Sequence, residues 1–231
     1  MITYSLPSSG IIHEKSKYIQ NDYFLMLTPL LDRPRLETQE NRRLHFCRTK
    51  EEISLSSQGV WQVHNGVVQL STISSNGDEI LLGWVKPGQF FGNWFSSLEI
   101  YTATALTDVY LIWYPITEIE SSLRLSQQIL PQLISRIRQT ELLISISCQR
   151  KVEDRLFQLL ELLKKELGQP VSEGIKISIR LTHQQIACAI NSTRVTITRL
   201  LSKLEQQGYI NIDEERHIII KEQKFAKIGY L

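Results

Sequence analysis

Short apolar runs and turn dipeptides alternate along residues 42–114. Within these runs, hydrophobic and polar positions follow a period of two, which is typical of half-buried strands. Asn65-Gly66 and Asn76-Gly77 each separate two such runs, and an Asn-Gly pair favours the type I′ turn of a β-hairpin. Pro87-Gly88 ends a further run, and residues 101–114 alternate as one more strand. Many strands without a helix between them predict a small antiparallel β-roll or barrel.

Beyond residue 115 the spacing of apolar residues changes to three and four, which is the period of an α-helix. This pattern predicts a short helix over residues 117–126, a long helix that begins at Pro131, and a third helix over residues 152–167. Proline is favoured in the first turn of a helix because it has no N–H group to donate inside one. Gly168 is expected to end the third helix.

The long helix carries Leu and Ile on more than one side, which is more apolar surface than packing against a single roll requires. Leu133, Ile137 and Ile144 recur at helical spacing along it. A parallel dimer seam is a natural use of such a surplus. We therefore expect a homodimer held together by this helix, with a hinge near residues 147–151, where the apolar periodicity lapses.

Residues 181–208 have the pattern of two helices joined by a tight turn. Thr182 and Thr193 are good N-caps for the two helices, and Asn191 suits the turn because Asn tolerates a left-handed backbone. The strand, charged turn and strand over residues 209–221 predict a wing. The residues expected to be buried are Ile186, Ala187 and Ile190 in the first helix, and Ile197, Leu200, Leu201 and Leu204 in the second.

Charge is unevenly distributed along the chain, although the net charge is only +2. Residues 1–135 hold 10 Lys and Arg against 13 Asp and Glu, whereas residues 136–231 hold 16 against 11. Five basic residues and no acidic residue lie within residues 174–204. Such a stretch suits a polyanion, because Lys and Arg displace counterions from phosphates. With the two-helix pattern it favours double-stranded DNA as the partner; the alternative is an ordinary helical hairpin with solvated arginines.

A second helix of this kind enters the major groove with its N-terminal residues against the base edges. Arg194 and Arg199 can each donate two hydrogen bonds to a guanine, and Val195 can pack on a thymine methyl group. The start of the first helix is placed to hold phosphate, and Lys203 is expected to contact another phosphate. The expected DNA-binding residues are Thr182, His183, Gln184, Thr193, Arg194, Val195, Thr196, Arg199 and Lys203.

The strings LTHQQIACAI and STRVTITRLL, at residues 181–190 and 192–201, resemble the helix-turn-helix of the CRP/FNR superfamily, most of all its nitrogen-control (NtcA) branch. A looser resemblance covers residues 42–167. The resemblance implies an α+β fold: an N-terminal, cyclic-nucleotide-binding-like antiparallel β-roll, a long dimerisation helix, and a C-terminal winged helix-turn-helix. The corresponding domains are residues 1–115, 116–150 and 151–231. The implied function is transcription regulation by a homodimer on a palindromic operator with GTA/TAC half-sites, with RNA polymerase as a further partner.

Members of this family commonly sense cyclic AMP, 2-oxoglutarate, haem or an iron–sulfur cluster. Phe91 and Gly92 match the family's effector cassette, but no Arg or Lys lies between residues 86 and 124, so a bound phosphate would lack its guanidinium partner. We therefore expect no cyclic AMP and no required cofactor. The aromatic residues expected to fill the pocket instead are Trp84, Phe90, Phe91, Trp94 and Phe95. Arg136 and Glu141 match positions near 2-oxoglutarate in NtcA-like proteins, so a 2-oxoglutarate-responsive nitrogen regulator is the alternative, and an exposed helical pair is the other interpretation.

Other classes of protein find little support. The chain has no apolar stretch of membrane-spanning length and no leader-like N-terminus. Cys47, Cys148 and Cys188 are few and far apart, which is typical of a reducing cytoplasm and disfavours a metal centre. No nucleophile–base set or phosphate-binding loop is recognisable. We therefore predict a cytoplasmic protein that is not an enzyme and holds no metal; a cupin-like metal enzyme fused to a helical domain is the rival, and a metal assay separates the two.

Overall fold

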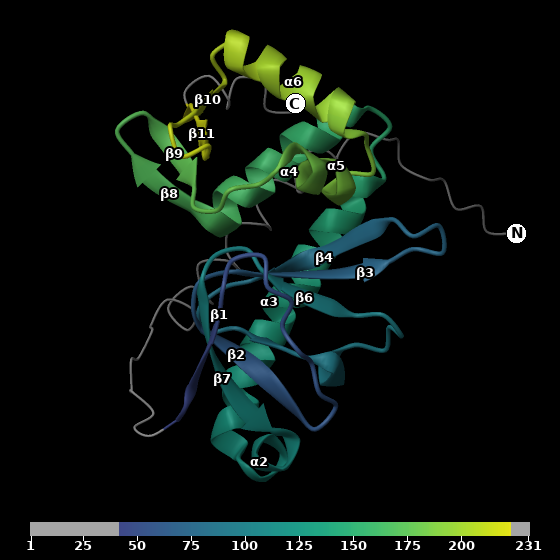
Figure 1. Ribbon diagram of the computed structural model, residues 1–231, viewed down its shortest axis with the longest axis vertical. Helices are drawn as coiled ribbons and strands as arrows, with labels where there is room; N and C mark the ends of the chain where they lie inside the picture. Colours follow the sequence, from purple (N-terminus) through teal and green to yellow (C-terminus); the bar gives the residue numbers. More distant parts are fainter. Residues whose placement is uncertain (1–41, 223–231) are drawn as a thin grey trace, which may run out of the picture. The chain divides into compact units, whose positions relative to one another are not determined.

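The computed structural model describes residues 42–222, and the statements below refer to this part of the chain (Figure 1). Its N-terminal strands form two antiparallel sheets, as the alternating pattern predicts. The larger sheet has the order β1 (Leu44–Cys47), β7 (Val109–Pro115), β2 (Gly59–Asn65) and β5 (Phe90–Phe91). The smaller sheet has the order β4 (Glu79–Val85), β3 (Val68–Ile73) and β6 (Thr102–Ala105). A short 3-10 helix, η1 (Asn93–Phe95), follows β5.

The turn at Asn65-Gly66 does not close a hairpin, so that prediction is wrong. β2 pairs with β7 and β5, whereas β3 pairs with β4 and β6, and the chain therefore passes between the two sheets at this turn. Gly66 has a φ of +89°, and a side chain there would overlap the carbonyl oxygen of Asp108. Because glycine has no side chain, it allows the two backbone segments to approach each other closely at this position. Asn76-Gly77 does connect the paired strands β3 and β4, whereas residues 101–114 divide into β6 and β7, in different sheets.

Two helices, α2 (Ile116–Ser121) and α3 (Leu123–Ser147), follow the sheets. Helix α3 contains Pro131 in its interior and does not begin there, contrary to the prediction. Its start is set by Ser122, whose hydroxyl accepts a hydrogen bond from the N–H of Leu125 at 3.3 Å. Pro131 leaves the carbonyl of Gln127 without a helical donor, and Gln127 is exposed to solvent. An exposed proline site of this kind is compatible with a continuous helix.

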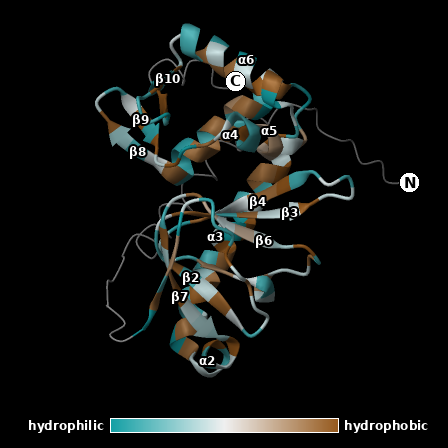
Figure 2. Cartoon of the chain, in the orientation of Figure 1, coloured by the Kyte–Doolittle hydropathy of each residue, from teal (hydrophilic) through white to brown (hydrophobic). Residues whose placement is uncertain are grey.

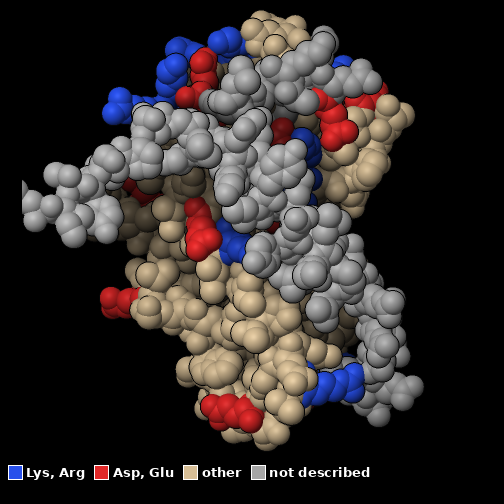
Figure 3. Space-filling view, turned by 180° about the vertical axis from the view of Figure 1, so that it is seen from behind, with Lys and Arg blue, Asp and Glu red and all other residues tan. Residues whose placement is uncertain are grey.

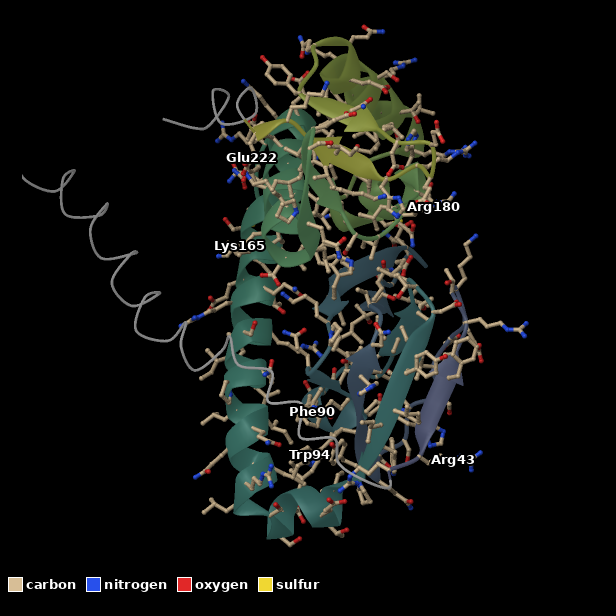
Figure 4. All side chains as sticks on the ribbon, turned by 90° about the vertical axis from the view of Figure 1, so that its left-hand side faces the viewer. Arg43, Phe90, Trp94, Lys165, Arg180 and Glu222 are labelled. Carbon is tan, nitrogen blue, oxygen red and sulfur yellow. The ribbon has the colours of Figure 1, made fainter. Side chains whose placement is uncertain are left out.

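Helix α3 packs against β5 of the larger sheet and β4 of the smaller one. Phe90 and Tyr114 of the sheet share a buried cluster with Leu125 and Ile129 of α3, and Figure 4 shows Phe90 between this helix and the strands. The expected aromatic filling of one pocket is not what the structure shows. Trp84, Phe90 and Phe91 belong to three different buried clusters, and Trp94 is 44% exposed.

The C-terminal part begins with α4 (Val152–Leu167), which ends at Gly168 as predicted. The elements that follow are β8 (Gly168–Val171), β9 (Gly174–Ile177), α5 (His183–Ala189), α6 (Arg194–Gln206), β10 (Ile210–Ile212) and β11 (Ile218–Ile220). The predicted wing, β10 and β11, extends into a four-stranded sheet with the unexpected hairpin β8–β9. Hydrophobic residues on α4, α5, α6 and the wing share one core (Figure 2). None of the helices described is long and apolar enough to cross a membrane.

Candidate nucleic-acid interface

Two N-caps and one left-handed residue set the geometry of the pair α5 and α6. The Thr182 hydroxyl accepts a hydrogen bond from the N–H of Gln185 at 3.1 Å, and the Gln185 side chain accepts one from the N–H of Thr182 at 2.8 Å. This is a capping box. Thr193 accepts from the N–H of Thr196 at 3.2 Å and so caps α6, while Asn191 in the turn has a φ of 50°. These three local predictions are confirmed.

The inner face of the helix pair is also as the spacing predicts. Ile186, Ile190 and Ile197 are at most 1% exposed. Leu200 and Leu204 are only partly buried and pack at the edge of the same core. The recognition of this face from sequence succeeds because helical periodicity alone decides which residues point inward.

The opposite side of α6 is open to solvent at its N-terminal half. Arg194 and Arg199 are exposed, and Val195 is 59% exposed. Figure 3 shows Lys and Arg side chains gathered at the end of the molecule where α6 lies. Thr196 differs from these residues, because it is half-buried and its hydroxyl lies 2.9 Å from that of Thr193. The structure thus leaves two guanidinium groups and one apolar side chain free to meet base edges.

A hollow of about 690 Å³ lies where α5, α6 and the wing meet. His183 and Gln184 line it from α5, Arg194 from α6, Arg180 from the β9–α5 connection and Arg216 from the wing. Arg180 is labelled in Figure 4. No Asp or Glu is among the described residues that line the hollow. Three guanidinium groups around one concave surface favour a nucleic acid, because each presents several N–H donors in a fixed plane that suit a phosphate or a guanine edge.

Arg180 and Arg216 are absent from the residues predicted to contact DNA. Arg180 belongs to the basic stretch at residues 174–204, but it precedes the helices on which that prediction concentrated. Arg216 follows two glutamates in the wing turn, so the local sequence is not basic and does not indicate a DNA contact. Only the folding of the wing against the helix pair brings the two arginines to one surface.

Hydrogen bonds hold the acidic residues of the wing turn. The Lys176 ammonium group on β9 lies 2.7 Å from Asp213 and 3.3 Å from Glu215, and Asp213 also accepts the backbone N–H of His217 at 2.7 Å. These bonds, that of Lys176 above all, lower the pKa of Asp213 from 3.8 to about 2. Asp213, Glu215 and His217 could offer ligand atoms within 4.8 Å of one another to a metal ion. Lys176, however, already supplies the positive charge at this point.

Lys203, predicted to contact a phosphate, lies outside the hollow. Its Nζ atom is 2.9 Å from the carboxylate of Glu153 on α4, and both side chains are more than half exposed. An exposed pair of this kind contributes little to stability. It also offsets the charge that Lys203 would present to a phosphate.

The candidate effector residues lie on β5, directly after it, and on α3. Phe91 is fully buried, and a side chain at Gly92, which has a φ of +156°, would press on Val60 at 3.2 Å. Arg136 lies on α3, where it donates a hydrogen bond to the hydroxyl of Tyr101 at 3.3 Å, and Tyr101 packs against the buried cluster that contains Phe91. Glu141 is an exposed residue of the same helix. Tight backbone packing accounts for the glycine at position 92.

The predicted seam residues on α3 differ in exposure. Ile137 and Ile144 are 58% and 59% exposed, whereas Leu133 packs against the roll cluster that contains Phe90. Leu123 and Leu130, which are 73% and 59% exposed, precede Ile137 at seven-residue steps. The seven-residue spacing can be read from the sequence. The long helix was expected to begin at Pro131, however, which left these two leucines outside it.

Comparison with known proteins gives consistent matches. The family model described as Crp-like helix-turn-helix domain matches residues 154–225. A global nitrogen regulator of Nostoc sp. strain PCC 7120 is 36% identical over 174 residues, which cover 71% of this chain and 78% of the relative. The regulatory protein CysR of Synechococcus elongatus is 36% identical over 165 residues, covering 70% of this chain and 76% of that protein.

Solved structures agree in fold. The structure of FixK2 from Bradyrhizobium japonicum superposes with a TM-score of 0.69 at 18% sequence identity, over 83% of this chain and 98% of that one. At this identity the likeness shows the fold alone. The predicted α+β arrangement of sheets, long helix and C-terminal helix-turn-helix with a wing is thereby confirmed.

Proposed function

Because this chain belongs to the CRP/FNR family of DNA-binding, helix-turn-helix transcription regulators, we propose that it binds a palindromic operator as a homodimer. The observation that carries the proposal is the exposed start of α6, with Arg194 and Arg199, beside the hollow lined by Arg180 and Arg216. The first pair is placed for base edges in the major groove, and the second pair for the phosphates that flank it. The relatives are transcription regulators, and the chain is accordingly no enzyme.

The dimer seam in this proposal runs along α3. Leu123, Leu130, Ile137 and Ile144 recur every seven residues and are all more than half exposed in the single chain. An apolar row with this period is the pattern of a parallel coiled coil, in which each side chain inserts between residues of the facing helix. Leu133 lies outside this row and is partly buried against the roll.

In this proposal, residues 1–115 act as the sensor-like domain, residues 116–150 as the dimerisation helix and hinge, and residues 151–231 as the DNA-binding domain.

The two-fold symmetry of the dimer then defines the operator. The two α6 helices would enter half-sites about one helical turn, roughly 34 Å, apart. Because residues 192–201 resemble the nitrogen-control branch, we propose GTA/TAC as the half-site. We also propose RNA polymerase as a partner at the promoter.

We propose that cyclic AMP is not the effector of this protein. The roll has no basic residue between residues 86 and 124, so a buried phosphate would stay unpaired. The competing ligand is 2-oxoglutarate, because Arg136 supplies a guanidinium group beside Tyr101. A global nitrogen regulator and the regulatory protein CysR are both 36% identical to this chain, so identity does not choose between these alternatives. Titration calorimetry with cyclic AMP and with 2-oxoglutarate distinguishes between them.

The stoichiometry of the DNA complex tests the proposal. Two protomers are expected on one duplex that carries the inverted GTA/TAC repeat, as measured by sedimentation equilibrium. A duplex with a single half-site should bind at least about tenfold more weakly, because only one of two linked recognition helices makes specific contacts. Equal affinity for the two duplexes, or a complex with one protomer, would contradict the proposal.

A further inference from the structure

A groove of about 270 Å³ runs between helices α4 and α6. No described residue lines both this groove and the hollow beside the wing. Phe157 of α4 is buried where it lines the groove. The other large apolar side chains along it are only partly buried and pack at the edge of the C-terminal core; they are Leu200, Leu204 and Tyr209. Such walls can bury a further apolar side chain, as grooves that bind the apolar face of a helix do.

The charge of the groove differs from that of the hollow. Its lining includes two acidic side chains, Glu153 and Asp154, and one basic side chain, Lys203. The Nζ atom of Lys203 lies 2.9 Å from the carboxylate of Glu153, and both side chains are more than half exposed at the rim. An excess of negative charge disfavours a phosphate, because like charges repel. The groove therefore suits a protein segment that combines apolar and basic residues better than it suits a nucleic acid.

The chain leaves the described part of the molecule beside this groove. The N–H of Lys221 donates a hydrogen bond to the carbonyl oxygen of Tyr209 at 2.9 Å, and Tyr209 lines the groove. The next residue, Glu222, is the last one described and is labelled in Figure 4. Residues 223–231 follow, and a segment of this length can span at most about 30 Å. The groove lies within that reach, because its wall residue Tyr209 is bonded to Lys221.

The composition of residues 223–231 is complementary to the groove. The segment reads QKFAKIGYL, with Lys224 and Lys227 and no acidic residue. Phe225 and Ile228 are three residues apart, as the two lysines are. Residues three apart are neighbours at helical spacing, so this pattern sets an apolar pair next to a basic pair. The groove presents the counterpart, since its apolar walls adjoin an acidic rim.

We propose that residues 223–231 bind in this groove, with Phe225 packed between α4 and α6 and the two lysines at the acidic rim. The segment then ties the C-terminal half of α6 to α4. Attachment to Glu222 raises its effective concentration at the groove far above that of a partner in solution, which favours this occupant over a second protein. The inference does not depend on DNA, so it stands or falls separately from the proposed function.

Photo-cross-linking tests where the segment binds. The cross-linking amino acid p-benzoylphenylalanine, in place of Phe225 in the full chain, should form bonds within one chain to groove residues such as Phe157 and Leu204, as mapped by mass spectrometry. The same amino acid in place of Gln223, about 200° away at helical spacing, is the matched control and should not react with the groove. A cross-link between two chains would assign the groove to a second copy. That result, or reaction only outside the groove, would overturn the proposal.

Hydrogen exchange tests whether the segment ties the two helices together. In a protein that ends at Glu222, backbone amides in the last two turns of α6 should exchange at least about tenfold faster, because burial of one phenylalanine side chain is enough for a change of this size. Phe225→Asp should produce the same increase in the full-length chain. Gln223→Asp adds the same charge on the other side of the segment and should leave the exchange rates unchanged.

The point variants also keep the test decisive. Thermal unfolding first establishes that each protein folds, and Phe225→Asp provides the comparison if the shortened protein does not. Exchange rates in α6 that stay unchanged in Phe225→Asp would overturn the proposal. An equal increase in Gln223→Asp would also contradict it, because the effect would then come from added charge and not from a buried side chain. Failure of the protein to bind DNA would overturn the proposed function and leave this inference untouched.

Discussion

Replacing Arg194 or Arg199 with alanine is expected to weaken binding to the specific operator by about 1–3 kcal/mol, which is about 5- to 150-fold. Both side chains are exposed at the start of α6, where a recognition helix meets base edges. Each variant should also lose the preference for guanine in the half-site, because a GTA/TAC half-site holds one G·C pair. Competition binding with duplexes that differ at single base pairs measures both effects.

A matched control for this prediction comes from the wing. Arg216→Ala should weaken binding to all sequences alike and reduce the salt dependence by about one unit, because Arg216 lines the hollow proposed to hold a phosphate. Lys203→Ala should have a small effect, since Lys203 is paired with Glu153. A uniform loss for Arg194, Arg199 and Arg216 would show that none of them reads a base.

Replacing Ile137 with aspartate is expected to convert the dimer to monomers. Ile137 is 58% exposed in the single chain and stands in the middle of the apolar heptad row on α3. In a parallel seam the two carboxylates would face each other without partners, and an unpaired buried charge costs about 3–5 kcal/mol. Operator affinity should then fall at least about 100-fold, because the two recognition helices bind independently. Sedimentation velocity and binding titrations check the two expectations.

Gln128→Asp is the matched control for the dimer prediction. Gln128 is exposed on the same helix, and it is about 180° around the helix axis from Ile137 at 100° per residue. It adds the same charge outside the seam and should leave the dimer intact. An unaltered dimer in Ile137→Asp, or monomers in both variants, would move the interface away from the heptad row.

Local chemistry explains why the helix-turn-helix was predictable to single residues. Thr182, Asn191 and Thr193 act through hydrogen bonds and backbone angles within a few positions of themselves, so their types reveal their roles. Helical periodicity likewise identifies Ile186 and Ile197 as core residues. These features do not depend on any distant part of the chain.

Most of the features that the sequence did not reveal depend on a partner distant in sequence. Gly66 meets Asp108 of another connection, which no dipeptide pattern reveals. Leu133 has the spacing of a seam residue and is also partly buried against the roll. Arg216 reaches the hollow only because the wing folds against the helix pair. Pro131 is a local signal that was outweighed by the cap at Ser122.

Selection of bound sequences from random double-stranded DNA tests the central claim most directly, because it presumes no operator and no effector. The account predicts an inverted repeat in which two GTA/TAC half-sites lie about one helical turn apart. Guanine at the conserved half-site position should disappear from the consensus selected by Arg194→Ala or by Arg199→Ala. A consensus without two-fold symmetry, or no enrichment of any sequence, would contradict the account.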